Sequence, residues 1–154
     1  MVHQCGRNPR PARLLLIAFA FGVLTCCVWI YTYAQRRLAA IAYIESNGGS
    51  VEFLDDPAWL PEGISLPYWL WTVNRINTGE RPDFDFAHVA VLRETEYLEC
   101  SHVDDLRMQH IGRLRRLEGI EVSDSTITDA GLAPLRNCRR LGSLVITSSK
   151  ITGQ

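Results

Sequence analysis

The sequence predicts an α/β chain in which an N-terminal transmembrane helix precedes a short solenoid of parallel strands and short convex helices. Three observations predict this fold class. A run of 21 residues without an acid or base lies near the N-terminus, positions of one residue class recur at a 24-residue offset after Glu96, and the copies share the spacing L-x-x-[IL]-x-[VI]. Long apolar runs are typical of membrane spans, and recurrence over a few dozen residues is typical of repeat architectures.

Residues 14–34, Leu14 to Ala34, form the predicted membrane-spanning helix. At a rise of about 1.5 Å per residue, the 21 residues cover about 31 Å, close to the roughly 30 Å of a hydrocarbon core. Trp29, Tyr31 and Tyr33 lie at its C-terminal end, where aromatic rings favour the interface. A cleaved signal peptide would have a shorter apolar stretch. The stretch "VLTC", which ends at Cys26, is a poor lipidation motif. We therefore expect a retained anchor.

Charge divides the chain at the end of this run. Residues 1–37 hold five arginines and no acid, whereas the rest of the chain holds 11 basic and 17 acidic residues. The basic tail, residues 1–13, carries three of the five arginines, which favours an N-terminus in the cytoplasm and repeats on the outer side. The acidic remainder argues against a nucleic-acid partner, because such a partner requires a basic surface.

Between the span and the repeats we expect a helix, a short strand and a connector. In residues 35–54, apolar residues recur at helical spacing until Asn47-Gly48-Gly49, and Val51 to Leu54 then alternate like a strand. Residues 55–87, with four prolines and several acids, predict an irregular Pro/aromatic connector. Its aromatic stretch, Tyr68 to Trp71, is expected to pack against the neighbouring domain.

Residues 88–154 contain about two and a half repeats, beginning with a strand candidate at His88 to Leu92. At the 24-residue offset, three columns keep one residue class through three copies. They are Leu98, Val122 and Ile146; Ser101, Ser125 and Ser149; and Val103, Ile127 and Ile151. Alternate apolar residues are expected to point inward from a short strand. The serines Ser101, Ser125 and Ser149 are expected to form a structural ladder that bonds backbone groups left unpaired by the turns.

The second half of each copy predicts a short helical element. In "TDAGLAPLRNC", Thr128 or Asp129 is expected to cap the helix, and Pro134 is expected to keep it short. One copy cannot bury its apolar side alone, so stacking on neighbours is expected to complete the core. Without a closing element, "LVITSSKITGQ" would be an open edge that the connector, another copy or a partner covers.

These residues resemble a known family. "ITDAGLAPLRNCRRLGSLVITSSKIT" is similar to the TDAGL-type leucine-rich repeats of bacterial proteins, and the likeness covers residues 96–154. The anchor followed by "AIAYIESNGGSVEF" is similar to membrane-anchored members of that family. The first copy departs from the pattern, because Arg107 stands in place of the glycine. The resemblance implies a curved solenoid that works by protein contact, and it implies no reaction.

The concave side of such a solenoid is the expected partner-binding face, because outward-pointing strand residues line it. These residues are Tyr97, Glu99, Glu121, Ser123, Val145 and Thr147. The expected function is that of a membrane-tethered protein–protein interaction module without catalytic activity. The alternative is a structural or vestigial repeat protein that self-associates in the membrane.

Neither catalysis nor a cofactor is expected. Cys100, His102 and His110 could suggest zinc, but they provide three ligands at irregular spacing without a paired C-x-x-C. Asp104-Asp105 and Asp124 lie where turns and helix caps favour short acids. No phosphate-loop, dinucleotide or nucleophile-elbow motif occurs. We therefore expect no metal and no small-molecule substrate, and either a protein partner or self-association.

Two arginine pairs, at 115–116 and 139–140, recur at the same place in the repeat. They predict a solvated basic stripe on the outside of the solenoid. Contact with phosphate or with lipid headgroups is the alternative role for such a stripe.

Overall fold

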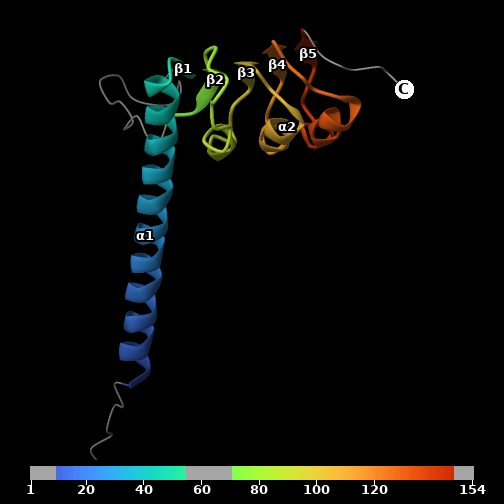
Figure 1. Ribbon diagram of the computed structural model, residues 1–154. Helices are drawn as coiled ribbons and strands as arrows, with labels where there is room; N and C mark the ends of the chain where they lie inside the picture. Colours follow the sequence, from blue (N-terminus) through green and yellow to red (C-terminus); the bar gives the residue numbers. More distant parts are fainter. Residues whose placement is uncertain (1–9, 55–70, 148–154) are drawn as a thin grey trace, which may run out of the picture. The chain divides into compact units, whose positions relative to one another are not determined.

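The computed structural model describes residues 10–54 and 71–147. It is a mixed α/β structure with one long apolar helix at the N-terminus and a five-stranded, mostly parallel sheet (Figure 1). The chain divides into two compact units, Met1–Gln35 and Arg36–Gln154. The second contains all five strands of that sheet and is called the sheet unit below.

Helices and strands alternate along most of the sheet unit. The elements are α1 (Arg10–Ser46), β1 (Ser50–Phe53), β2 (Val73–Asn77), the 3-10 helix η2 (Val89–Val91), β3 (Tyr97–Ser101), α2 (Asp105–Ile111), β4 (Gly119–Ser123), the 3-10 helix η3 (Asp129–Asn137) and β5 (Ser143–Ile146). The predictions for residues 1–9, for Tyr68 to Leu70, and for Ser149 and Ile151 lie outside the described residues. Trp71 is described, and its ring meets Phe53 of β1 with centroids 5.8 Å apart.

Helix α1 contains the predicted span and continues beyond it without a break. The expected span and the expected juxtamembrane helix are one element of 37 residues. Among the described residues, α1 is the one helix long and apolar enough to cross a membrane, from Leu14 to Ser46. It ends where the sequence predicts, since Gly48 has a left-handed φ of 84° and the Gly49 N–H donates to the Ile44 carbonyl oxygen at 3.0 Å.

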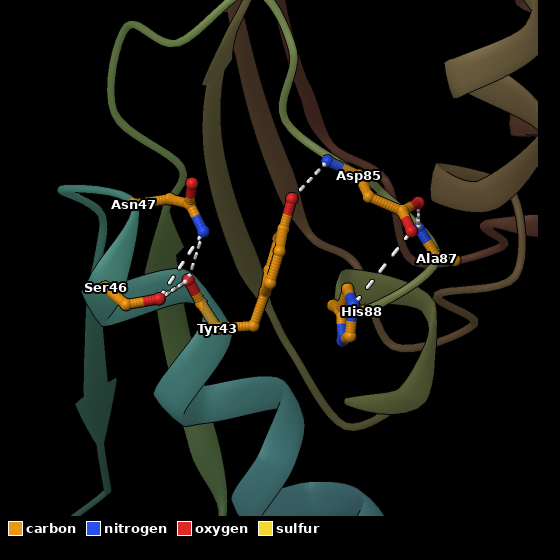
Figure 2. Close-up of polar contacts among 6 residues, drawn as sticks. All are labelled: Tyr43, Ser46, Asn47, Asp85, Ala87 and His88. Carbon is orange, nitrogen blue, oxygen red and sulfur yellow. Dashed lines mark hydrogen bonds and ion pairs between the residues drawn. The ribbon is translucent and has the colours of Figure 1, made fainter.

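The last turns of α1 belong to the sheet unit and are fixed to its core. Ile41 and Ile44 are 1% and 0% exposed. The Tyr43 ring stacks on His88 with centroids 4.0 Å apart, and its hydroxyl accepts a hydrogen bond from the Asp85 N–H at 3.0 Å (Figure 2). Tyr43 thereby joins this part of α1 to the segment that leads into η2.

The strands lie in the sheet in sequence order, β1-β2-β3-β4-β5. β1 pairs antiparallel with β2, and the other three pairs are parallel. Successive side chains of a strand point to opposite faces, so one face of this sheet can be apolar. Ile76, Leu98 and Ile120 form one row of that face and are each at most 3% exposed. They share one hydrophobic core with residues of α1, α2 and η3.

The predicted 24-residue register is wrong between β3 and β4. Leu98 pairs with Ile120 rather than with Val122, and Cys100 pairs with Val122. These two strands therefore follow a 22-residue offset, as β2 and β3 also do. Between β4 and β5, Val122 pairs with Ile146, which is the predicted 24-residue offset.

The offset changes in the turn after β4. His102 and Asp124 directly follow β3 and β4, and both have a positive φ, 53° and 45°. The helix cap Asp104 lies two residues after His102, whereas the cap Thr128 lies four residues after Asp124. Two extra residues in this turn let the helical elements keep the 24-residue offset while β3 and β4 follow the 22-residue offset.

The predicted serine ladder is not a single column. Ser101 pairs with Ser123 rather than with Ser125. Ser101 and Ser125 are both buried, and their hydroxyls donate to the carbonyl oxygens of Gly79 at 2.8 Å and of Thr147 at 3.1 Å. The two serines do satisfy backbone groups, but their bonds run to opposite neighbours, the first toward the β2 side and the second toward the β5 side.

The predicted connector, residues 55–87, contains part of the sheet and of the core. Its residues Val73–Asn77 form β2, which pairs with strands on both sides. Phe84 and Phe86 from the same segment are 3% and 2% exposed. Only long-range pairing identifies this segment as structured, because its prolines and acids favour irregular chain.

The strand candidate at His88 to Leu92 is wrong. Residues Val89–Val91 form the 3-10 helix η2. Val89 and Leu92 are both 0% exposed. Their spacing of three residues is one turn of a 3-10 helix, so both side chains face the core from the same side of that helix.

One carboxylate joins α2 to η3. Asp105 of α2 accepts hydrogen bonds from the Thr128 N–H at 2.9 Å and from the Thr128 hydroxyl at 2.7 Å. Thr128 is the N-cap residue of η3, but its side chain makes no capping bond, and its hydroxyl donates to Asp105 instead. Gly131 leaves room for this carboxylate, because a Cβ there would lie 2.1 Å from Asp105 Oδ1.

The first copy differs from the second in the roles of its acids and of Arg107, which stands where the second copy has Gly131. Asp104 caps α2 as expected for an acid in a turn, accepting from the Arg107 N–H at 2.8 Å. Arg107 occupies the position equivalent to Gly131 in the 24-residue alignment. Its guanidinium donates to the carbonyl oxygens of His102 and Pro82, and so ties α2 to the segment before η2.

The Asp105 contact predicts a pH-dependent stability. The two bonds from Thr128 hold the pKa of Asp105 below its ordinary value. Ionised Asp105 therefore stabilises the folded chain above about pH 3.9, and this contribution is lost as the pH falls through the lower pKa of the folded state. Asp105→Asn should lower the denaturant midpoint of the full chain in detergent micelles at neutral pH, and the difference from the unsubstituted chain should disappear in acid.

Asp124→Asn is the matched control for this measurement. Asp124 is exposed and has a positive φ that asparagine also tolerates, so its substitution should leave the midpoint unchanged. A difference for Asp105→Asn that is equally large in acid and at neutral pH would contradict the proposed role of the charge.

Candidate functional site

One face of the sheet points away from the core, and we call it the open face. It consists of the outward positions of β2 to β5: Arg75, Asn77, Tyr97, Glu99, Gly119, Glu121, Ser143 and Val145. Strand pairing arranges them in two rows. One row is Arg75, Tyr97, Gly119 and Ser143, and the other is Asn77, Glu99, Glu121 and Val145.

Four of the six residues predicted for partner binding lie on the open face. They are Tyr97, Glu99, Glu121 and Val145. Tyr97 and Val145 are 38% and 46% exposed, which leaves both available for contact. The other two lie at the ends of the strands. Ser123 is the last residue of β4, and Thr147 follows β5 and donates its N–H to the Val122 carbonyl oxygen at 2.9 Å.

Besides Gly119 and Ser143, which begin β4 and β5, two open-face residues, Arg75 and Asn77, were not predicted. They belong to β2, inside the segment expected to be an irregular connector. Only the strand register identifies them. A 22-residue offset matches Ile76 with Leu98, whereas the 24-residue offset does not align the two.

β2 supplies the groups that neutralise Glu99. Arg75 Nη1 lies 2.9 Å from Glu99 Oε1, and Asn77 Nδ2 donates to Glu99 Oε2 at 3.0 Å. The same guanidinium lies 3.8 Å from Glu52 Oε2 of β1 and 5.5 Å from the centroid of the Tyr97 ring. Both oxygens of Glu99 are therefore engaged within the sheet, and Arg75 is the cation that it shares with Glu52.

Tyr97 lies against a position that has no side chain. A Cβ on Gly119 would lie 2.8 Å from Tyr97 Cδ1, closer than ordinary contact allows. The ring therefore extends over β4 from its own strand. An exposed ring held in this way offers apolar area together with a hydroxyl, the combination that favours tyrosine at binding surfaces.

Glu121 is the exposed carboxylate of the open face that takes part in no described ion pair. It is exposed and lies between Glu99 and Val145 in its row. No ion pair of the described residues includes its carboxylate. A cationic group from another molecule could therefore bind Glu121 without displacing an existing partner.

Two hollows flank Glu121 and Glu99. One has a volume of about 180 Å³ and is bordered by Arg75, Tyr97 and Val145. The other has a volume of about 250 Å³ and is bordered by Asn77 and Ser123. Both are too small and open for an enclosed ligand, but they can accept single side chains of a macromolecule.

The two described cysteines of the sheet unit, Cys100 and Cys138, are buried. Burial raises the pKa of the Cys100 thiol, which faces the core, and burial also raises the pKa of Cys138. A buried thiol with a raised pKa is a poor nucleophile and a poor metal ligand. Across residues 10–54 and 71–147, no group of three or more His, Cys, Asp or Glu residues could hold a metal ion.

Comparison with models of protein families, with curated proteins and with solved structures finds no match to this chain.

The Arg75–Glu99 contact predicts a measurable coupling. In a double-mutant cycle of Arg75→Met and Glu99→Gln, the two residues should couple by about 0.2–1 kcal/mol, the range of partly exposed ion pairs. The coupling should fall in about 1 M salt, because screening then acts over about 3 Å. Denaturant unfolding of the full chain in a non-ionic detergent measures both. Strictly additive effects at low salt would show that the ion pair contributes nothing.

Proposed function

We propose that this chain is a single-pass membrane protein whose sheet unit is a short leucine-rich-repeat solenoid used for protein–protein contact without catalysis. The tether is the apolar run from Leu14 to Ala34, with the N-terminus in the cytoplasm and the sheet unit on the outer side. The likeness of residues 96–154 to TDAGL-type repeats supports the family assignment. The three arginines before the run against two after it support the orientation.

The arrangement of the sheet unit supports a solenoid. From β2 to β5 the strands are parallel neighbours in sequence order, and each of β2, β3 and β4 is followed by a helical element. The 22-residue offsets from β2 to β4 and the 24-residue offset from β4 to β5 fit the roughly 20–29 residues of a leucine-rich repeat. Gly131 gives the glycine of the "TDAGL" motif a physical reason, since it leaves room for the carboxylate of Asp105.

The binding role rests on one observation, the exposed Glu121 carboxylate beside the Tyr97 ring on the open face. The partner that fits this chemistry is a basic or polar protein segment, with a cation on Glu121 and an apolar group on Tyr97 or Val145. The face is four strands wide and smaller than the roughly 800 Å² per partner of a stable complex. The expected engagement is weak or multivalent.

Self-association in the membrane is the second candidate. Leu144 and Val145 of β5 are 44% and 46% exposed, so β5 offers apolar area that another copy could cover. A copy bound there would contact residues of β5 rather than Arg75 or Asn77 at the other side of the open face.

Site-specific photo-crosslinking in the membrane distinguishes the candidates. A photoreactive residue at 145, which leaves the Glu121 carboxylate in place, should form adducts with a different protein in the full-length chain. The same residue at Leu106, 70% exposed on α2, is the control and should not form them. Glu121→Lys, tested with the photoreactive residue at 145, should reduce adducts at least about tenfold, since reversal of one contacting charge costs more than about 1.4 kcal/mol.

The charge control is Asp83→Lys, an exposed acid in the turn before η2. It changes the net charge as Glu121→Lys does, and it should leave the adducts unchanged. Adducts made only with further copies of the chain would favour self-association. Adducts equally abundant at 106 and 145 would contradict a binding role for the open face.

A further inference from the structure

A second charged surface lies at the end of the sheet where the strands begin. Arg93, Arg115 and Arg139 each stand four residues before the first residue of β3, β4 and β5 respectively, and all three are exposed. Backbone bonds join the segments that carry them, as when the Gly119 N–H donates to the Glu96 carbonyl oxygen at 3.0 Å. The three arginines therefore occupy equivalent places on neighbouring segments.

Two adjoining hollows open among these arginines. One, of about 190 Å³, is lined by Arg93, Gly112, Arg113, Arg115 and Asn137. The other, of about 410 Å³, is lined by Arg115, Arg136, Asn137 and Arg139. Arg115 and Asn137 line both, and none of the described lining residues is acidic. We call the five arginines Arg93, Arg113, Arg115, Arg136 and Arg139 the arginine cluster.

The arginine cluster has no internal counter-charge. The ion pairs within residues 36–54 and 71–147 include none of its five members. Arg140, next in sequence to the cluster, is by contrast 3.9 Å from Glu118. Five neighbouring guanidinium groups repel one another, so an anion between them relieves that repulsion.

The donor geometry of this site favours phosphate. A guanidinium presents parallel N–H groups that match two oxygens of a phosphate, and it keeps its charge at all physiological pH values. The side-chain amide of Asn137 adds a neutral donor to both hollows. A carboxylate needs only one arginine, whereas several arginines together suit a phosphate or a diphosphate. The chemistry of this site therefore favours phosphate.

The position of the cluster in the chain indicates where phosphate would come from. Arg37 of α1 forms an ion pair with Glu94, which is adjacent to Arg93 of the cluster. Arg37 also donates to the Trp71 carbonyl oxygen at 2.6 Å, which fixes it in the sheet unit. In sequence, Arg37 lies three residues after Ala34, the last residue of the apolar run. Within the sheet unit, Arg37 thus contacts the residue that follows Arg93 of the cluster.

We infer that the arginine cluster binds the phosphate groups of anionic phospholipids in the membrane that holds α1. Headgroup phosphates are abundant where a membrane-spanning helix leaves the bilayer, and arginines near an anionic surface are each attracted to it. The inference rests on the anchor of the proposed function and is independent of its protein partner. The predicted solvated stripe, Arg115-Arg116 and Arg139-Arg140, would on this account supply only Arg115 and Arg139 to lipid.

The test compares lipid binding by full-length variants. The chain is purified in a non-ionic detergent, and its dissociation constant for phosphatidylglycerol is measured by native mass spectrometry, with phosphatidylcholine as the neutral-headgroup comparison. Arg115→Gln with Arg139→Gln should raise the constant for phosphatidylglycerol at least about tenfold. Both residues are exposed, so the fold should persist, and near-ultraviolet circular dichroism checks this.

Two further variants separate charge from geometry. Arg81→Gln with Arg116→Gln removes two exposed arginines outside the cluster and should leave the constant unchanged. Arg115→Lys with Arg139→Lys keeps the charge but loses the paired N–H geometry, and should weaken binding by less than the glutamine variant does. Equal loss from the Arg81/Arg116 variant and the Arg115/Arg139 glutamine variant would overturn the site, because it would show an effect of net charge alone.

Nanodiscs test the source of the phosphate. Discs of phosphatidylcholine alone or of an equimolar mixture with phosphatidylglycerol should hold the chain equally, but only the mixture should slow amide exchange at residues 112–118 and 136–142. Protection by soluble tripolyphosphate with no effect of disc composition would overturn the lipid source in favour of a free phosphate compound. Failure to associate with either disc would overturn the anchor and, with it, the lipid inference. If photo-crosslinking gives no adducts with a protein partner but phosphatidylglycerol still slows amide exchange, only the protein-binding role of the open face is contradicted.

Discussion

Burial of inward apolar side chains between neighbouring strands is the interaction on which the rest of the sheet unit depends. Ile76, Leu98 and Ile120 form a row with Leu144. The first three, each between two described strands, are at most 3% exposed, whereas Leu144, with a described strand on one side, is 44% exposed. Full burial of such a side chain is worth about 1.5–3 kcal/mol. Each strand–helix segment therefore depends on its neighbours for its own stability.

The contacts between segments keep this stacking in place. Asp105 holds the start of η3, and its carboxylate fits because Gly131 has no side chain. Gly112 lets α2 approach η3 equally closely, since a Cβ there would lie 2.6 Å from Pro134 Cβ. At the other end of the core, Tyr43 fixes the last turns of α1 to the segment before η2. Helix α1 thus contains the apolar run, and its last turns pack against the core of the sheet unit.

Most fold elements that depend on local pattern could be predicted, although the apolar residues from His88 to Leu92 were wrongly expected to form a strand. The elements that depend on pairing could not be predicted. The apolar run, the helix end at Gly48 and the helical halves of the copies follow from composition and spacing. The 24-residue offset is correct for these helical halves, but two extra residues after Asp124 make it wrong for β3 and β4. β2 was missed because its residues are recognisable only by the strands on either side of it.

The candidate site divides in the same way. Alternation along β3 to β5 was enough to predict that Tyr97, Glu99 and Glu121 point outward. It could not predict that Arg75 neutralises Glu99, because that contact needs β2, nor that Gly119 makes room for the Tyr97 ring. The net negative charge after residue 37 also hid a separation of charge, with acids on the open face and the arginine cluster where the strands begin.

Disulfide trapping across β3 and β4 tests the stacking most directly. The account predicts that cysteines replacing Glu99 and Glu121 form a disulfide under mild oxidation, because these Cα partners lie on adjacent strands about 4.8 Å apart. Cysteines replacing Glu99 and Ser123, the pair that a 24-residue register would align, should not form one, since diagonal neighbours are about 7–8 Å apart. Peptide mass spectrometry of the full chain identifies the linked residues. Trapping of the 99–123 pair without the 99–121 pair would contradict the register and the two-row open face built on it.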